Sequence, residues 1–386
     1  MLNTNFTSWP NFSNEEAEAV KKVLLNNKVN YWTGQECRNF EKEFAEWSQT
    51  KYAVALANGT LALDVAFKCL GIGDGDDVIV TSRSYIASIS SIVNSGARPV
   101  FADVDLSSQN ITLDSIRSVI TDKTAAILCV HLAGWPCEMD EIMDFANKKK
   151  LFVIEDCAQA HGAKYKGKSV GSFGNVGCWS FCQDKIMTTG GEGGMVTTND
   201  ETLWRKMWAY KDHGKSYQAI YERKQDKGFK WVHETFGTNW RMTEMQAAIG
   251  RIQLKRMQEW HNKRLSYANS IWNVAKNYNR LRVPTLPHYI EHAAYKCYVF
   301  VNDDKTDIRD EMIQKINQKG VPCYSGSCSE VYLEKAFEKT NFRPKKRLQN
   351  AKKLGETSLM FLVHPTLTKE EIIKTCNVLS EVAQKL

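Results

Sequence analysis

One lysine of this chain stands where it could do covalent chemistry. Lys185 follows a short apolar run and precedes two threonines and four glycines, in the stretch SFCQDKIMTTGGEGG at residues 180–194. The pattern predicts a strand that ends before Lys185 and a loop whose backbone can approach a ligand closely, because glycine has no Cβ atom. A partly buried lysine amine can lose its proton and act as a Schiff-base nucleophile. The alternative is a solvated loop charge.

A Schiff base with an aromatic aldehyde cofactor would need partners, and the sequence offers one for each requirement. These are a helix N-terminus and a hydroxyl for a phosphate, a carboxylate for a pyridinium, an aromatic ring for stacking and an amide for a phenolate oxygen. Gly59, Thr60 and Ser180 are the candidates for binding the phosphate. Asp156 is the candidate for the pyridinium, Tyr85 for stacking and Gln159 for the phenolate oxygen. Asp156 could instead cap a helix, Tyr85 could belong to the core, and Ser180 could be an ordinary strand residue.

The elements that must position these residues form an α/β pattern. Apolar runs rich in β-branched residues predict strands, and helical segments separate them. In a mostly parallel sheet, ligands bind at the carboxyl ends of strands, and the candidate residues lie near such ends. The predicted strands are 52–60, 78–82, 99–104, 124–134 and 151–163, and the predicted helices between them are 61–70, stopped by Gly71, and 86–95.

Further helices flank this pattern on both sides. A helix is predicted over 15–25 with Asn14 as its cap, and another over 40–49 with its aromatic residues in the core. A long helix over 243–272, with an apolar stripe of Met245, Ile249, Ile252 and Met257, suggests a bridge between domains. After a linker at 284–289 come a strand at 297–304 and helices at 308–320 and 369–386. We therefore expect a large domain over 1–255 and a smaller α+β domain over 256–386.

Composition narrows the class of protein. The chain has 386 residues, a net charge of +7 and 43% hydrophobic residues, without a concentrated basic tract, so nucleic acid is not an expected partner. No run approaches the ~20 apolar residues of a membrane span, and the start of the chain does not resemble a secretory signal. The 11 cysteines are scattered, which predicts reduced thiols, no structural metal and a cytoplasmic location.

Five ordered segments carry a resemblance that no single residue could. They are ANGTLAL, SRSYIASISSIVNSGARPVFADVD, VIEDCAQAHGAKYKGKSVGSFGNVGCWSF, DKIMTTGGEGGMVTTN and NWRMTEMQAAIGRIQL. Together they resemble the DegT/DnrJ/EryC1/StrS family, strongly over about residues 30–260. The resemblance implies an aminotransferase that uses pyridoxal 5′-phosphate (PLP) and acts on nucleotide-linked keto sugars. It also implies the type I aspartate-aminotransferase fold, with a mostly parallel seven-stranded sheet.

The resemblance assigns a role to each matching residue. Lys185 matches the Schiff-base lysine, Asp156 the partner of the pyridine nitrogen, Gln159 the residue facing the phenolic oxygen and Tyr85 the stacking aromatic. The phosphate contacts match Gly59, Thr60 and Ser180, together with Asn239, which the family donates from the neighbouring subunit of a homodimer. Asn239 could instead cap its own helix, a task that Thr243 could also perform.

Two departures from the family pattern leave questions open. The loop after Lys185 carries one extra glycine, and the segment 324–335 lacks the expected histidine, so no sugar contacts are carried over. The resemblance implies a reaction that moves the amino group of L-glutamate to a keto sugar, with C4 of a 4-keto-6-deoxyhexose favoured over C3. A sugar 3-dehydratase would carry a histidine in place of Lys185. A non-catalytic sensor protein on the same fold is the alternative of another class.

Overall fold

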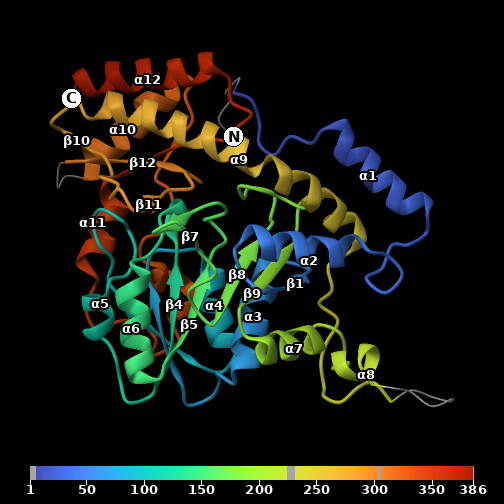
Figure 1. The fold of residues 1–386 in the computed structure, drawn as a ribbon. Coiled ribbons are helices and arrows are strands. Elements are labelled where there is room, and N and C mark those ends of the chain that lie inside the picture. The colour runs from blue at the N-terminus through green and yellow to red at the C-terminus, as the bar shows by residue number, and fades with distance from the viewer. Residues whose placement is uncertain (1–5, 224–230, 303–305, 386) are drawn as a thin grey trace.

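The computed structural model describes residues 6–223, 231–302 and 306–385, and its main feature is a seven-stranded sheet (Figure 1). The strand order is β1-β9-β8-β5-β4-β2-β3. Strand β9 runs against both of its neighbours, and the other strands share one direction. The strands are β1 (Tyr52–Leu56), β2 (Asp77–Thr81), β3 (Arg98–Ala102), β4 (Thr124–Val130), β5 (Phe152–Asp156), β8 (Val176–Ser180) and β9 (Gly194–Thr198). The predicted fold class is confirmed.

Helices cover both faces of this sheet. Alternate residues of one strand belong to different cores: Val78 and Val80 of β2 pack in one, and Ile79 packs in the other. This alternation is why the strands are apolar throughout rather than at every second position. The first core contains side chains of α2 (Glu36–Trp47), α3 (Gly59–Leu70), α4 (Ile86–Asn94) and α7 (Glu201–Tyr210). The second contains side chains of α5 (Leu113–Arg117) and α6 (Met139–Lys149).

The long helix α9 (Glu244–Ala275) runs from this part of the molecule to a second sheet (Figure 1). Leu254 and Met257 of α9 pack in the first core, whereas Ile271 and Trp272 pack beside the second sheet. That sheet has the antiparallel order β10-β12-β14-β13, and α10 and α12 cover it. Since α9 is continuous across residue 255, the predicted domain boundary there stays a prediction.

The remaining elements complete the chain. The second sheet consists of β10 (Leu281–Arg282), β12 (Cys297–Val301), β13 (Cys323–Tyr324) and β14 (Ser358–Phe361), with α10 (Thr306–Gln318), α11 (Gln349–Thr357) and α12 (Lys369–Gln384) nearby. A three-stranded sheet joins β6 (Lys164–Tyr165), β7 (Lys168–Ser169) and β11 (Ile290–Glu291). Helices α1 (Asn14–Leu25) and α8 (Tyr217–Tyr221) and short 3₁₀ turns at Leu132–Gly134, Val331–Leu333 and Lys335–Phe337 account for the rest. Within the described ranges, no helix is both long and apolar enough to cross a membrane.

Several local predictions were wrong. Asn14 is the first residue of α1 rather than its cap; Ser13 is the cap, and its backbone N–H donates to the Glu16 carboxylate at 2.6 Å. The strands predicted over 124–134 and 151–163 end earlier, at Val130 and Asp156, because turns follow them. Residues 303–304 of the strand predicted at 297–304 lie outside the described residues.

The apolar stripe predicted on the long helix was also largely wrong. Met257 is buried, but Met245, Ile249 and Ile252 are only partly buried. The buried face of α9 instead carries small residues and a few large ones, including Ala247, Ala248, Leu254 and Trp260. Small residues let the helix lie close to its neighbours, so apolar character alone did not identify the packed face.

Candidate active site

The predicted site residues meet at the carboxyl ends of two neighbouring strands. Strands β5 and β8 are parallel, and Asp156 lies opposite Cys178 in their register. Ser180, the last residue of β8, is two residues further on. Asp156 and Ser180 are only 6% and 8% exposed. The parallel sheet therefore brings the two together at one edge, as the sequence predicted.

Asp156 is held by hydrogen-bond donors. The Ser88 hydroxyl, on α4, donates to Oδ2 at 2.7 Å, and the Ala158 backbone N–H donates to Oδ1 at 3.1 Å. Ser84 lies 2.9 Å from Ser88 and extends this network. Donors are the partners that a carboxylate anion takes. Asp156 is not the cap of a helix, so that alternative does not apply, and Ser88 is a supporting residue that the sequence did not reveal.

The N-terminus of α3 closes on Ser180. Asn58 caps the helix, with its side-chain oxygen accepting the Leu61 N–H at 3.0 Å. The N–H groups of Gly59 and Thr60 come first in the helix and have no partner within it. A Cβ atom on Gly59 would lie 2.5 Å from the Cβ of Ser180, so only glycine permits this approach. Free N–H groups, the helix dipole and a hydroxyl thus converge on one cradle, which suits a phosphate.

Lys185 is not a solvated loop charge. Its side chain is 15% exposed, and its Nζ lies 3.4 Å from Oδ1 of Asp184. The Tyr295 hydroxyl donates to the other oxygen of Asp184, and the Trp9 indole N–H donates to the Lys185 carbonyl at 2.8 Å. Burial raises the pKa of Asp184, but Lys185 and the Tyr295 hydrogen bond lower it more, so the pKa lies below its usual range. Asp184 is therefore an anion that partners the lysine.

Two of the glycines after Lys185 are required by close packing within the chain. A Cβ on Gly193 would meet the hydroxyl of Thr189, and a Cβ on Gly194 would lie 2.2 Å from the Asn58 carbonyl oxygen. Gly190 and Gly191 have φ values of 86° and 122°, which favour glycine. These contacts explain two of the glycines by packing against the cap of α3 and within the loop, and the approach of this backbone to a ligand stays a prediction.

The other predicted residues are placed less closely around the lysine. Gln159 accepts the Ala133 N–H at 2.9 Å through its side-chain oxygen, which leaves its NH₂ end as the donor that a phenolate needs. Tyr85 directly precedes α4 and is 69% exposed, so it is not a core residue. Asn239 is exposed, and Thr243 caps α9, which excludes Asn239 as the cap. The structure leaves the stacking role of Tyr85 and the phosphate role of Asn239 as predictions.

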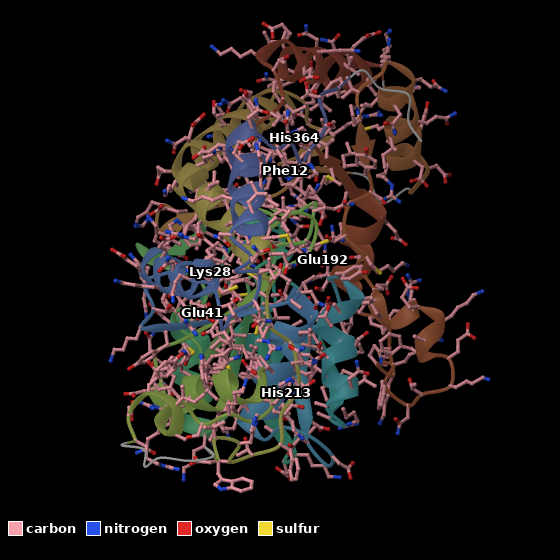
Figure 2. All side chains as sticks on the ribbon, turned by 90° about the vertical axis from the view of Figure 1, so that its right-hand side faces the viewer. Phe12, Lys28, Glu41, Glu192, His213 and His364 are labelled. Atoms are coloured by element: carbon pink, nitrogen blue, oxygen red, sulfur yellow. The ribbon has the colours of Figure 1, made fainter. Side chains whose placement is uncertain are left out.

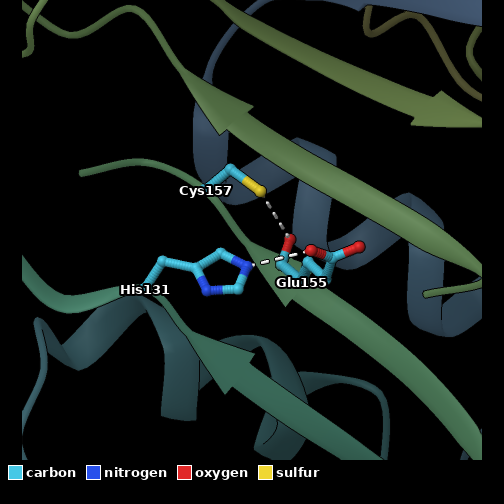
Figure 3. Close-up of side chains that lie close together, drawn as sticks. All are labelled: His131, Glu155 and Cys157. Atoms are coloured by element: carbon cyan, nitrogen blue, oxygen red, sulfur yellow. Dashed lines mark hydrogen bonds and ion pairs between the residues drawn. The ribbon is translucent and has the colours of Figure 1, made fainter. Parts of the chain in front are cut away.

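Next to Asp156 is a buried cluster of His131, Glu155 and Cys157, whose ligand-type atoms lie within 4.8 Å of one another (Figure 3). Glu155 uses its lone pairs within the protein. One oxygen accepts from the N–H groups of Phe173 and Gly174 at 2.8 and 2.7 Å. The other accepts from Gly171 N–H at 2.7 Å and lies 2.9 Å from Nε2 of His131. The cluster therefore ties β4, β5 and the 171–174 loop together through hydrogen bonds, which is a structural role.

The sequence of the chain matches a known protein family. A family model described as the DegT/DnrJ/EryC1/StrS aminotransferase family matches residues 10–380. The chain belongs to this family. Family membership confirms the predicted enzyme class, an aminotransferase, and its cofactor, PLP.

Individual members of the family support the same reading. The GDP-perosamine synthase of Escherichia coli O157:H7 is 35% identical over 96% of both chains. The dTDP-3-amino-3,4,6-trideoxy-alpha-D-glucose transaminase of Streptomyces venezuelae is 31% identical over 96% of this chain and 93% of that protein. The crystal structure of an aminotransferase from Psychrobacter cryohalolentis is 63% identical, covers 98% of this chain and 99% of its own, and superposes with a TM-score of 0.96. These relatives identify the chain as similar to sugar aminotransferases.

The residues at the strand ends fit PLP. The cradle between Gly59 and Ser180 suits its phosphate, the donor-held Asp156 suits a pyridinium, and Lys185 offers the amine that an aldehyde requires. When bound, PLP supplies an electron sink for the carbanion formed at the substrate carbon. The protein supplies binding, orientation and charge.

Proposed function

We propose that this aminotransferase moves the amino group of L-glutamate to a nucleotide-linked keto-deoxysugar, a 4-keto-6-deoxyhexose, in making an amino sugar for a surface polysaccharide. The observation that carries the proposal is the placement of Lys185. Its amine is largely buried beside the anion Asp184, at the strand edge that also holds Asp156 and the α3 cradle.

Each residue of the site would have a separate role in the reaction. Lys185 Nζ would take the proton from the α-carbon of the donor as general base and would then donate it to C4′ of the cofactor as general acid. Asp184, 3.4 Å away, would stabilise the ammonium form between these transfers. Asp156 would keep the ring nitrogen protonated, and the NH₂ group of Gln159 would donate to the phenolic oxygen.

The sugar acceptor is supported by relatives rather than by contacts. Two relatives have names that place an amino sugar on a GDP or dTDP carrier, and one of these names puts the amine at C3. Amination at C3 is therefore the alternative to C4. Polar groups of the 324–335 segment are used within the chain, because the Tyr332 hydroxyl donates to Glu330 and Arg347 pairs with Glu330.

We also propose a homodimer whose active sites are shared through Asn239. Asn239 is exposed and near two exposed aromatic residues, Trp231 at 82% and Phe236 at 100%, which a partner subunit would cover. The Trp240 carbonyl accepts the Ala57 N–H at 2.9 Å, so this segment runs beside the end of β1 in its own chain. The side chain of Asn239 would extend from there into the phosphate cradle of the partner.

The proposed function is tested by incubating the purified protein with PLP, L-glutamate and a panel of nucleotide-linked 4-keto and 3-keto sugars, followed by mass detection of products. The expected result is a product, formed from a 4-keto sugar, whose mass corresponds to an amino group in place of the ketone. If only 3-keto sugars are aminated, the proposed position of amination changes from C4 to C3. Loss of a sugar hydroxyl without amine transfer would indicate a dehydratase, and failure to take up PLP would indicate a non-catalytic protein. Lys185→Ala is the matched negative control.

A further inference from the structure

A pocket of about 260 Å³ opens beside the lysine, on the side of the second sheet. Asp184, the neighbour and ion-pair partner of Lys185, lines it, and so do Trp9, Arg264, Lys296 and His364. Its volume lies below the ~300–1,000 Å³ of pockets for drug-sized ligands, so it fits a small molecule rather than a nucleotide sugar. It is a separate space from the cradle at Gly59 and Ser180.

Arg264, on α9, is the unusual group in this pocket. Its side chain is buried, with the residue 2% exposed, yet its Nε and Nη2 have no hydrogen-bond partner among the described residues. Its Nη1 makes only a long 3.4 Å bond to the Tyr295 carbonyl, and its guanidinium carbon lies 5.2 Å from the ring centroid of Trp9. Nitrogen donors that are buried without a partner cost free energy. Their presence at a pocket wall points to a ligand.

The charges around Arg264 favour an anion. Lys296 lines the same pocket, and its pKa is lowered to about 8 by burial and by the positive charges of Arg264 and Lys185, against the opposing pull of Asp184. Asp184 is the acidic residue of the lining, and it is already engaged by Lys185 and Tyr295. Two positive groups therefore face the pocket without an acidic side chain to spare.

The free nitrogens of Arg264 also define the shape of that anion. Nε and Nη2 lie along one edge of the planar guanidinium, and their N–H groups match the two oxygens of a carboxylate in a bidentate pair. The lining also includes His364, which is labelled in Figure 2. Its ring stacks on that of Trp9, with centroids 6.1 Å apart. The apolar faces of these rings would lie along the carbon chain of the ligand.

We propose that Arg264 heads a binding subsite for a carboxylate of the amino-acid donor, with Lys296 as a second positive group. The inference rests on the proposed function, because it assumes that the donor reacts at Lys185. The geometry supports this placement: Asp184 lines the pocket, and its Oδ1 lies 3.4 Å from Lys185 Nζ. A donor anchored at Arg264 would thus have its amine end directed toward the lysine.

The test separates the two half-reactions of the PLP-loaded enzyme. L-Glutamate or L-alanine is titrated against the cofactor absorbance in stopped-flow, and the keto sugar is titrated separately against the amine form. For Arg264→Gln we expect the half-saturating glutamate concentration to rise about ten- to hundred-fold, the usual effect of losing a charged hydrogen-bonded pair. The half-saturating sugar concentration should not change. Arg264→Lys should give an intermediate loss of glutamate binding, because lysine keeps the positive charge but cannot form the bidentate pair with a carboxylate.

A second readout does not depend on turnover. Glutarate, a dicarboxylate without an amine, should bind the loaded wild-type enzyme in calorimetry and fail to bind Arg264→Gln. The matched control is Arg256→Gln on the same helix, since Arg256 pairs with Glu15 and Glu16 away from the pocket. If Arg264→Gln does not fold, Lys296→Gln replaces it, with an expected several-fold loss for glutamate.

The outcomes are distinguishable. If the enzyme reacts with no amino acid but glutarate still binds through Arg264, the proposed function is contradicted and the carboxylate-binding site is still supported. Unchanged glutamate and glutarate binding in folded Arg264→Gln would overturn the subsite. A change confined to the keto-sugar titration would also overturn it, because the carboxylate would then belong to the sugar. Equal losses for glutamate and alanine would identify the α-carboxylate, and a loss for glutamate only would identify the side-chain carboxylate.

Discussion

Replacing Glu155 with glutamine tests how the strand that carries Asp156 is held in place. The carboxylate of Glu155 is fully buried and serves four donors: His131 and the N–H groups of Gly171, Phe173 and Gly174. Each oxygen serves two of them. A glutamine keeps one oxygen, and its NH₂ group cannot accept a hydrogen bond, so two of the four donors lose their acceptor.

The size of the effect follows from that count. Hydrogen bonds to charged groups contribute about 1.5–3 kcal/mol each, so losing two predicts a destabilisation of about 3–6 kcal/mol. This is a large part of the ~5–15 kcal/mol that stabilises a typical folded domain. Urea unfolding at pH 7 measures the free energy of unfolding. Glu201→Gln, which removes the exposed partner of Arg205, is the matched control and should unfold like the wild type.

The pH dependence of the same pair of proteins gives a second check. Burial alone would raise the pKa of Glu155, but His131 and the N–H groups of Gly174 and Gly171 lower it below its usual value. The stabilisation should therefore be complete above the unfolded pKa of ~4.3 and disappear as the pH falls through the lower folded pKa. The difference between wild type and Glu155→Gln should be constant from pH 7 to about 5 and shrink below that. A destabilisation under ~1 kcal/mol at pH 7 would refute the count of lost acceptors.

Three further predictions concern catalysis. Lys185→Ala should abolish amine transfer in the product assay while the variant still binds PLP, since the cradle and Asp156 remain; turnover near the parent rate would contradict the assignment. Asp156→Asn keeps the size of the side chain but removes the charge, and we expect kcat to fall on the order of 10²-fold or more; unchanged kinetics would make Asp156 a structural residue. Mixing Lys185→Ala chains with chains that carry Asn239→Trp should restore part of the activity, because a shared site leaves one site of each mixed dimer intact. If subunits exchange and no activity returns, Asn239 acts within its own chain.

The order of strands and helices was readable from the sequence because it depends on local pattern. Apolar runs identified the strands of the large sheet other than β9, which was not predicted, although they did not give the exact strand ends. Gly71 and Thr243 ended or capped helices as their residue types predict. The motifs around Lys185 and Asp156 then identified the family, and the parallel sheet placed Asp156 and the end of β8 at one edge. Ordered motifs of this kind constrain chemistry more than any single residue does.

The supporting contacts were decided only by the tertiary structure. Ser88 and Asp156 are 68 residues apart in the chain, and no local pattern joins them. The same holds for Arg264 and the Trp9 ring, for His131 and Glu155, and for the packed face of α9, which apolar residues alone predicted wrongly. A hydrogen bond or an ion pair forms wherever folding brings two groups within about 3 Å, whatever their separation in sequence. Residue type therefore determined which chemistry was available, and packing determined which groups hold it in place.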